Sequence, residues 1–132
     1  MRRTSLQLLS LLLASSSAVS VCAQQSHDAS PMPRDAAIAQ LVASYSTAGC
    51  TSRFVDALKI TQEECAERVA SAKKDCPILI ADGLPPMINE KQVQMVVARA
   101  MGCKFAKTTG KPYDNAPWDR SAEAALLQQH GS

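Results

Sequence analysis

The sequence predicts an all-α fold: a small, disulfide-stapled bundle of three main helices plus a short C-terminal helix. Three observations lead to this prediction. Apolar residues recur at helical spacing, no strand-like alternation persists, and four cysteines follow the N-terminal segment. About 109 residues remain after that segment, enough for one domain and not two. We therefore expect a single helical domain over residues 35–130.

The N-terminal segment predicts export. Two arginines precede an apolar run rich in leucine and alanine, and the residues around Cys22 suit signal peptidase. The run is too short for a comfortable membrane span. We expect residues 1–23 to be a secretory signal peptide and residues 24–34 a disordered leader, with the mature chain periplasmic or secreted. A lipoprotein anchored through Cys22 is a minor alternative.

Removal of the signal peptide would leave a chain without net charge. The full sequence has 14 Lys and Arg against 12 Asp and Glu, and Arg2 and Arg3 belong to the predicted signal peptide. A neutral chain gives no electrostatic reason to expect binding to nucleic acid or to an anionic membrane. No later stretch is long and apolar enough to predict stable membrane insertion.

The first predicted helix begins near Asp35 and closes near Leu58. Residues 46–49 are poor helix formers, which predicts a kink or a short break just before Cys50. The apolar positions at helical spacing are Ile38, Leu41, Val42, Tyr45, Phe54, Ala57 and Leu58.

The central predicted helix spans Thr61–Cys76 and organises the fold. Thr61 and Glu64 form a capping-box pattern at its start. One face carries apolar residues at i, i+4, i+7 and i+11, namely Cys65, Val69, Ala72 and Cys76. Pro77 predicts the end of the helix, with residues 78–80 forming a further apolar turn at an angle.

The third predicted helix runs from about Glu90 to Lys107, after a second capping-box pattern at Asn89 and Gln92. Its main apolar stripe is Val93, Val96, Val97, Ala100 and Cys103. Further apolar residues extend this surface around the helix, namely Met95, Met101 and Phe105. A helix this apolar is either the most buried element or half of an interface, so a homodimer through Glu90–Lys107 is one alternative.

The C-terminal part predicts a loop over Lys111–Arg120 and a short helix over Ala122–Gln129, with Ser121 as its cap. Two of the five aromatic residues of the chain, Tyr113 and Trp118, fall in this loop.

The four cysteines of the predicted domain, Cys50, Cys65, Cys76 and Cys103, allow three pairings. A Cys65–Cys76 bond is disfavoured and would require the predicted central helix to be wrong, since eleven helical residues span roughly 16 Å and a disulfide needs Cα atoms within about 7 Å. An antiparallel return of the third helix would bring Cys103 towards Cys65. We therefore prefer Cys50–Cys76 with Cys65–Cys103, while Cys50–Cys65 with Cys76–Cys103 remains open.

The residues that usually carry catalysis or metal binding are scarce. His27 and His130 lie near the chain ends, and the cysteine spacings contain no C-x-x-C motif. The carboxylates at 63, 64 and 67 complement the positive end of a helix dipole. We therefore expect a non-enzymatic protein with no metal, no cofactor and structural disulfides.

Two stretches are candidates for partner binding, although both could instead cover the ends of the bundle. One is the proline-stiffened loop of Leu84, Pro85, Pro86 and Met87, and the other is the aromatic pair Tyr113 and Trp118.

The combined prediction is an exported helical protein that binds another protein, such as an inhibitor or immunity-type protein of the cell envelope. The first alternative is a carrier or sensor of a small apolar ligand, with a cavity lined by Met87, Met95 and Met101. The second alternative is a small hydrolase that uses Glu63 or Glu64.

Overall fold

The computed structural model describes residues 30–131 and confirms the all-α, disulfide-stapled fold. The predicted signal peptide, residues 24–29 and Cys22 lie outside the described residues. In chain order the elements are β1 (Met32–Pro33), α1 (Arg34–Ala43), the short 3₁₀ helix η1 (Thr47–Gly49), α2 (Ser52–Leu58), α3 (Gln62–Ala81), β2 (Met87–Ile88), α4 (Glu90–Thr109) and α5 (Ala116–His130).

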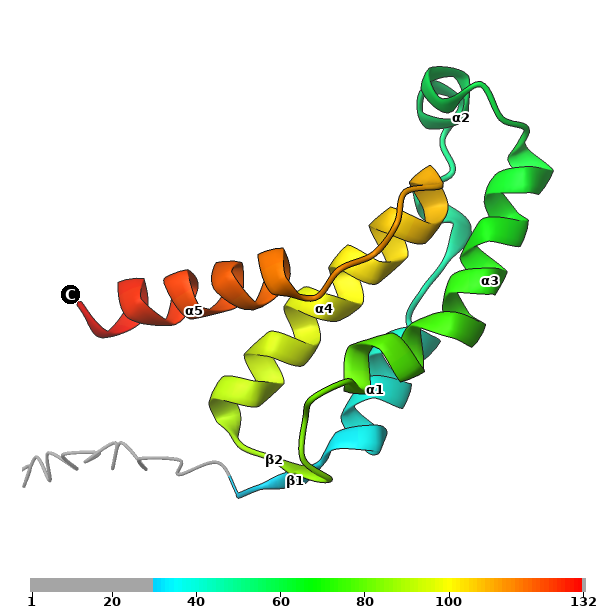
Figure 1. Ribbon diagram of the computed structural model, residues 1–132. Helices are drawn as coiled ribbons and strands as arrows, with labels where there is room; N and C mark the ends of the chain where they lie inside the picture. The colour runs from blue at the N-terminus through cyan, green and yellow to red at the C-terminus, as the bar shows by residue number, and fades with distance from the viewer. Residues whose placement is uncertain (1–29, 132) are drawn as a thin grey trace, which may run out of the picture.

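The two longest helices, α3 and α4, lie side by side and run in opposite directions (Figure 1). Helix α1 packs against both of them, and α2 sits near the start of α3. Helix α5 packs chiefly on α4 and projects away from the other helices. The fold is thus a helical core of α1, α3 and α4 with two outlying helices.

The buried face of α3 is the one that the sequence predicts. Cys65, Ala72 and Cys76 have no exposed surface, and Val69 is 4% exposed. They meet the buried stripe of α4, which includes Val96, Ala100 and Cys103. Burying these apolar side chains supplies the main favourable free energy of folding.

Both predicted capping boxes are present. The Thr61 hydroxyl accepts from Glu64 N–H at 3.0 Å, and the Glu64 carboxylate accepts from Thr61 N–H at 2.7 Å. Asn89 and Gln92 make the same reciprocal pair at the start of α4, both at 3.0 Å. These bonds satisfy backbone donors that the first helical turn leaves free, so they fix where α3 and α4 begin.

The predicted break in the first helix is also present. Helix α1 ends at Ala43, and α2 does not begin until Ser52. The Thr51 hydroxyl caps α2 by accepting from Phe54 N–H at 3.2 Å. The segment between the helices therefore turns the chain and places Cys50 in the core of the bundle.

The predicted end of the central helix at Cys76 is wrong. Helix α3 continues through Pro77 to Ala81, and it bends in the half that lies nearer α1 (Figure 1). A proline inside a helix removes one backbone hydrogen bond and favours a kink. Ile80 is completely buried beyond the proline, and its packing offsets that local cost.

The predicted boundaries of the C-terminal helix are also wrong. Helix α5 begins at Ala116, within the stretch predicted as a loop, and therefore includes Trp118. Pro117 stands in the first turn, where a proline loses no helical hydrogen bond. The Asp114 carboxylate accepts from Ala116 N–H at 3.0 Å just before that turn.

The predicted disordered leader ends earlier than residue 34. Met32 and Pro33 pair with Ile88 and Met87 in an antiparallel two-stranded ribbon. The next residue, Arg34, begins α1 and donates its backbone N–H to Pro86 O at 2.8 Å. The ordered domain therefore includes these three residues.

The preferred disulfide pairing is wrong, and the alternative is present. Cys50 bonds to Cys65 and Cys76 to Cys103, each pair with Cα atoms 5.9 Å apart. Between α3 and α4 the chain runs out to β2 before α4 begins (Figure 1). Cys103 stands thirteen residues into α4, roughly 20 Å along the axis, and so comes level with Cys76 instead of Cys65.

Candidate functional site

The proline-stiffened loop is only partly available for binding. Leu84 is buried, and its carbonyl accepts from the Arg34 guanidinium at 2.7 Å. Pro85, Pro86 and Met87 remain on the surface, with Met87 51% exposed. The loop thus clamps the start of α1 to the end of α3, and partner binding by its exposed residues stays a prediction.

Tyr113 and Trp118 do not form an aromatic pair on one loop. Tyr113 packs against the core and donates its hydroxyl to Arg99 O at 3.1 Å. Burial raises the pKa of Tyr113 well above its ordinary value. Trp118 instead lies in the first turn of α5, against α4, so the structure assigns the two residues to different roles.

Trp118 lines an open groove of about 450 Å³ between α4, the start of α5 and the η1–α2 segment. We call this cavity the main groove. Two of its side chains stand out from the surface: Met101 is 65% exposed and Phe105 is 53% exposed. The residues that line the main groove are Ser46, Gly49, Cys50, Phe54, Val69, Met101, Lys104, Phe105, Thr108 and Trp118.

A glycine on α4 makes room for Trp118. A Cβ added at Gly102 would lie 2.1 Å from the nearest indole carbon, so any larger residue there would collide with the ring. Gly102 itself is buried under the indole. The position of this wall of the groove therefore depends on the absence of a side chain at residue 102.

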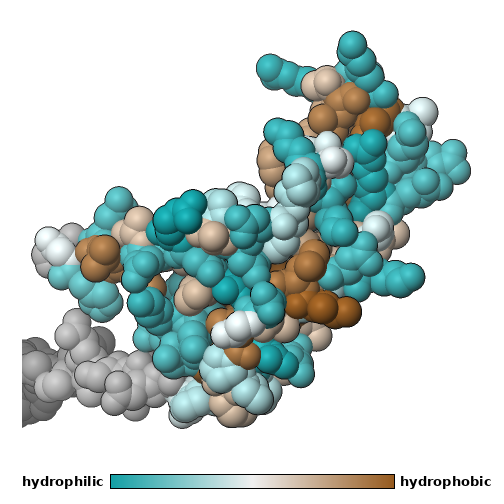
Figure 2. Space-filling view, in the orientation of Figure 1, coloured by the Kyte–Doolittle hydropathy of each residue, from teal (hydrophilic) through white to brown (hydrophobic). Residues whose placement is uncertain are grey.

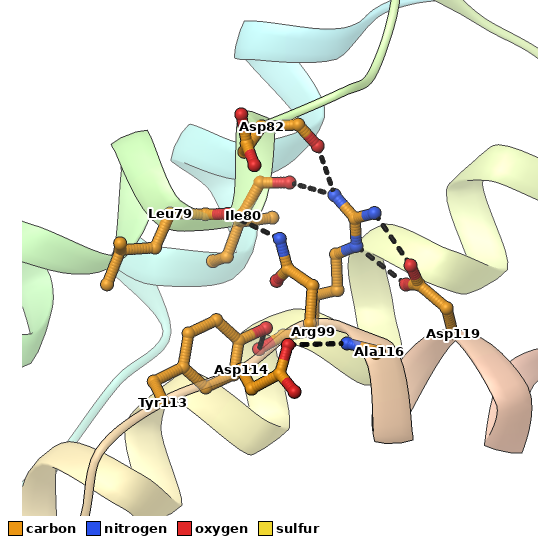
Figure 3. A network of polar contacts seen from close by, with 9 residues as sticks. Leu79, Ile80, Asp82, Arg99, Tyr113, Asp114, Ala116 and Asp119 are labelled. Atoms are coloured by element: carbon orange, nitrogen blue, oxygen red, sulfur yellow. Dashed lines mark hydrogen bonds and ion pairs between the residues drawn. The ribbon is translucent and has the colours of Figure 1, made fainter.

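An ion pair between Arg99 of α4 and Asp119 of α5 fixes the start of α5 (Figure 3). Arg99 is 5% exposed, and its Nε and Nη2 atoms donate to the two Asp119 carboxylate oxygens at 2.7 and 2.8 Å. Its Nη1 atom donates to the carbonyls of Ile80 and Asp82 at 2.8 and 2.7 Å. Hydrogen bonds with Asp119 raise the pKa of Arg99. Residues of α4, α5 and the end of α3 are thereby joined through one guanidinium.

Among the residues that the structure describes, Lys104 is the only charged side chain that lines the main groove. Its ammonium lies 5.7 Å from the centre of the Tyr45 ring, a cation–π arrangement. Within residues 30–131 no carboxylate lies within ion-pair distance of it. Tyr45 is buried beneath, donates its hydroxyl to Ala100 O, and has its pKa raised to about 12 by burial.

The face shown in Figure 2 is largely hydrophilic, with separate hydrophobic patches. Elsewhere on the molecule, Ile78 on α3 is 78% exposed and Leu127 on α5 is 71% exposed. Ile78 belongs to a shallower surface that also contains polar and charged residues, including Arg34 and Asp82. The main groove differs because its apolar side chains adjoin one another, with Lys104 as the one charged side chain that residues 30–131 contribute to it.

The carboxylates named for the hydrolase alternative are Glu63 and Glu64, and that alternative stays a prediction. Glu64 is engaged in the α3 capping box. Among the described residues no cluster of three or more His, Cys, Asp or Glu could hold a metal ion. In the same part of the chain, no helix is both long enough and apolar enough to span a bilayer.

The predicted cavity lined by three methionines is wrong. Met101 lines the main groove, whereas Met87 lies in β2 opposite Pro33, and Met95 is not among the groove residues. The sequence patterns also did not indicate Phe54, Lys104 or Gly102 as site residues. The available signal was the placement of Met101 and Phe105 outside the buried stripe of α4, which pointed to an interface.

Comparison of this chain with protein-family models, with curated protein sequences and with solved structures finds no match.

Proposed function

We propose that this chain is an exported, non-enzymatic binding protein that acts by contact with another protein through the main groove. One observation carries the proposal: Met101 and Phe105 stand 65% and 53% exposed beside Trp118 in a groove with one charged residue. Aromatic and methionine side chains are enriched in protein interfaces. A partner that covered these side chains would remove their apolar surface from water.

The groove is held in shape before any partner arrives. The Cys50–Cys65 bond ties one wall to α3, and the Arg99–Asp119 pair ties the start of α5 to α4. A surface that is already rigid loses less conformational entropy when it binds. A groove that is held rigid in this way is typical of a protein that acts by binding a partner.

Export belongs to the same proposal. Two disulfides in a chain of this size are compatible with an oxidising compartment, the periplasm or the extracellular space. The N-terminal signal-peptide pattern supports delivery to it. Within that setting we propose an inhibitor or immunity-type role, in which the chain blocks a toxin or hydrolase of the cell envelope.

The proposal is tested by affinity capture from an envelope extract with the tagged, oxidised chain. We expect one protein to be retained in stoichiometric amount and to be lost with Phe105→Asp. Ile78→Asp is the matched control, because it places the same charge on an exposed apolar position outside the groove. Equal retention by both variants, or retention of no protein, would contradict a contact through this groove.

A small apolar ligand is the second candidate, favoured by the apolar lining of the 450 Å³ main groove. Pockets that hold such ligands usually bury most of the ligand surface, whereas this groove leaves Met101 and Phe105 open. Native mass spectrometry of the exported protein separates the two. A co-purifying lipid together with no captured protein would favour the carrier function.

A further inference from the structure

A second, smaller cavity extends the main groove along α4. Its volume is about 160 Å³, and it lies between α4 and α5. Met101 lines both cavities, so they meet at this residue. The residues that line the second cavity are Gln94, Val97, Ala98, Met101, Ser121, Ala122, Ala125, Leu126 and Gln129.

Together the two cavities form a trough whose floor is one face of α4. Val97, Met101 and Phe105 follow each other at i, i+4 and i+8 along that face, a distance of about 12 Å. Residues of α5, including Trp118, line one side of the trough. Cys50 and Phe54, from the η1–α2 segment, line the part of the trough that belongs to the main groove. We call the combined surface the α4 trough.

We infer that the partner element bound in the α4 trough is an amphipathic helix that carries an acidic residue opposite Lys104. This inference rests on the proposed function. A helix offers apolar side chains at i, i+4 and i+7, which matches an apolar floor of about two turns. Apart from Ser46 and Cys50, the residues that line the trough belong to helices, whose backbone groups are hydrogen-bonded within each helix, and neither described strand lines it, so an added strand would find no sheet edge there.

Charge complementarity supplies the acidic residue. Lys104 is the only charged side chain that lines either cavity, and within residues 30–131 no carboxylate pairs with it. A bound helix would exclude water from its ammonium group. Covering an unpaired charge is costly, whereas an Asp or Glu on the partner would compensate it.

The test is a selection from a displayed library of 18-residue peptides built on a helical, alanine-rich scaffold, against the oxidised mature chain. We expect selected peptides to share large apolar residues at i, i+4 and i+7 with Asp or Glu beside them. Trp118 is the only tryptophan of the chain, so its fluorescence reports directly on the trough. A synthetic copy of a selected peptide should change that emission on binding.

Matched variants separate this recognition from general hydrophobic adhesion. Met101→Asp should weaken peptide binding by about tenfold or more, whereas Ile78→Asp should leave it unchanged. Lys104→Glu should convert the selected acidic residue into Lys or Arg, whereas Lys74→Glu, on the exposed side of α3, should not. Circular dichroism establishes that each variant is folded before it is used.

Three results would overturn the inference. One is an acidic preference that persists against Lys104→Glu. Another is a change in Trp118 emission when dodecanoate is added, together with no change when any selected peptide is added. That result would show that the trough binds a small amphiphile. The third is a wild-type dimer in sedimentation that Met101→Asp dissociates, which would assign it to a second copy. If envelope capture still depends on Phe105 while no helical peptide binds, the proposed function stands and the helix inference fails.

Discussion

The indole of Trp118 occupies the space that a side chain at Gly102 would need, with a residue-102 Cβ falling 2.1 Å from the ring. This contact joins α5 to α4 at the edge of the main groove. Trp118 of α5 can hold this position only because residue 102 of α4 is a glycine. The shape of the proposed binding surface therefore depends on a residue that does not line it.

Gly102→Ala should displace Trp118 and change the groove. The added methyl group overlaps the ring, and overpacking of this kind typically costs about 1–3 kcal/mol of the free energy of unfolding. We expect a shift in tryptophan emission and a lower thermal midpoint. Gly49→Ala is the control, because nothing lies within 4 Å of a Cβ at that position. Unchanged fluorescence in Gly102→Ala would show that the ring does not occupy this site.

Asp119→Ala should destabilise the chain far more than the loss of an exposed ion pair. It leaves the buried Arg99 guanidinium without its carboxylate partner, and such losses cost about 3–5 kcal/mol. Urea unfolding measures the difference. Glu123→Ala breaks the Lys91–Glu123 pair, in which both side chains are more than half exposed, and should cost less than about 1 kcal/mol. Similar losses in the two variants would contradict a structural role for the Arg99–Asp119 pair.

Removing either disulfide should lower stability by a comparable amount. The bonds close loops with sequence separations of 15 and 27 residues, for which chain entropy predicts contributions of about 3 and 3.5 kcal/mol. Cys50→Ala with Cys65→Ala should in addition loosen the wall of the main groove and alter Trp118 emission, because Cys50 lines it. Cys76→Ala with Cys103→Ala should lower stability with less effect on that emission.

Peptide mapping without reduction checks the pairing itself. The expected cross-linked peptides join Cys50 to Cys65 and Cys76 to Cys103. A peptide that joins Cys65 to Cys103 would contradict the arrangement of α3 and α4 described above.

Alkaline pH should destabilise the protein through Tyr45. Burial raises its pKa from 10.0 to about 12, so the folded state holds the neutral phenol while the unfolded chain releases the proton near pH 10. The stabilisation that the folded state gains from holding Tyr45 neutral is complete below pH 10 and is lost as the pH rises from 10 towards 12. Urea unfolding across this range should show a weaker pH dependence for Tyr45→Phe than for the wild type.

A spectroscopic titration provides an independent check. The chain has two tyrosines, and Tyr113 also has a raised pKa, so the folded protein should show no tyrosinate absorbance with a midpoint near 10. The Lys104 ammonium lies 5.7 Å from the centre of the Tyr45 ring, so Lys104→Met serves as the control for the effect of this neighbouring charge. An ordinary midpoint for both phenols would contradict their burial.

Local sequence signals determined where the two long helices begin and which of their faces are buried. The Thr61–Glu64 and Asn89–Gln92 pairs act between residues three positions apart, so their pattern can be read directly from the chain. The buried stripe of α3 likewise follows from helical periodicity. These features depend on neighbours within one element, and the sequence predicted them correctly.

The helix ends followed a different rule. Pro77 is a local signal against a helix, yet α3 passes through it. Pro117 is a local signal for a helix boundary, and α5 begins at Ala116, one residue before it. Burial of Ile80, and the contacts of Trp118 and Asp119, come from other elements. Packing contributes several kcal/mol, enough to offset one lost backbone hydrogen bond.

By itself the sequence determined an all-α, disulfide-stapled domain with four cysteines available for pairing and an excess of apolar surface on α4. Only the tertiary structure decided which cysteines pair, that Tyr113 packs partly buried against the core, and that Trp118, Met101 and Phe105 share one groove. The physical reason is the offset between helices. The segment through β2 sets how far α4 slides along α3, and no periodicity within either helix encodes that distance.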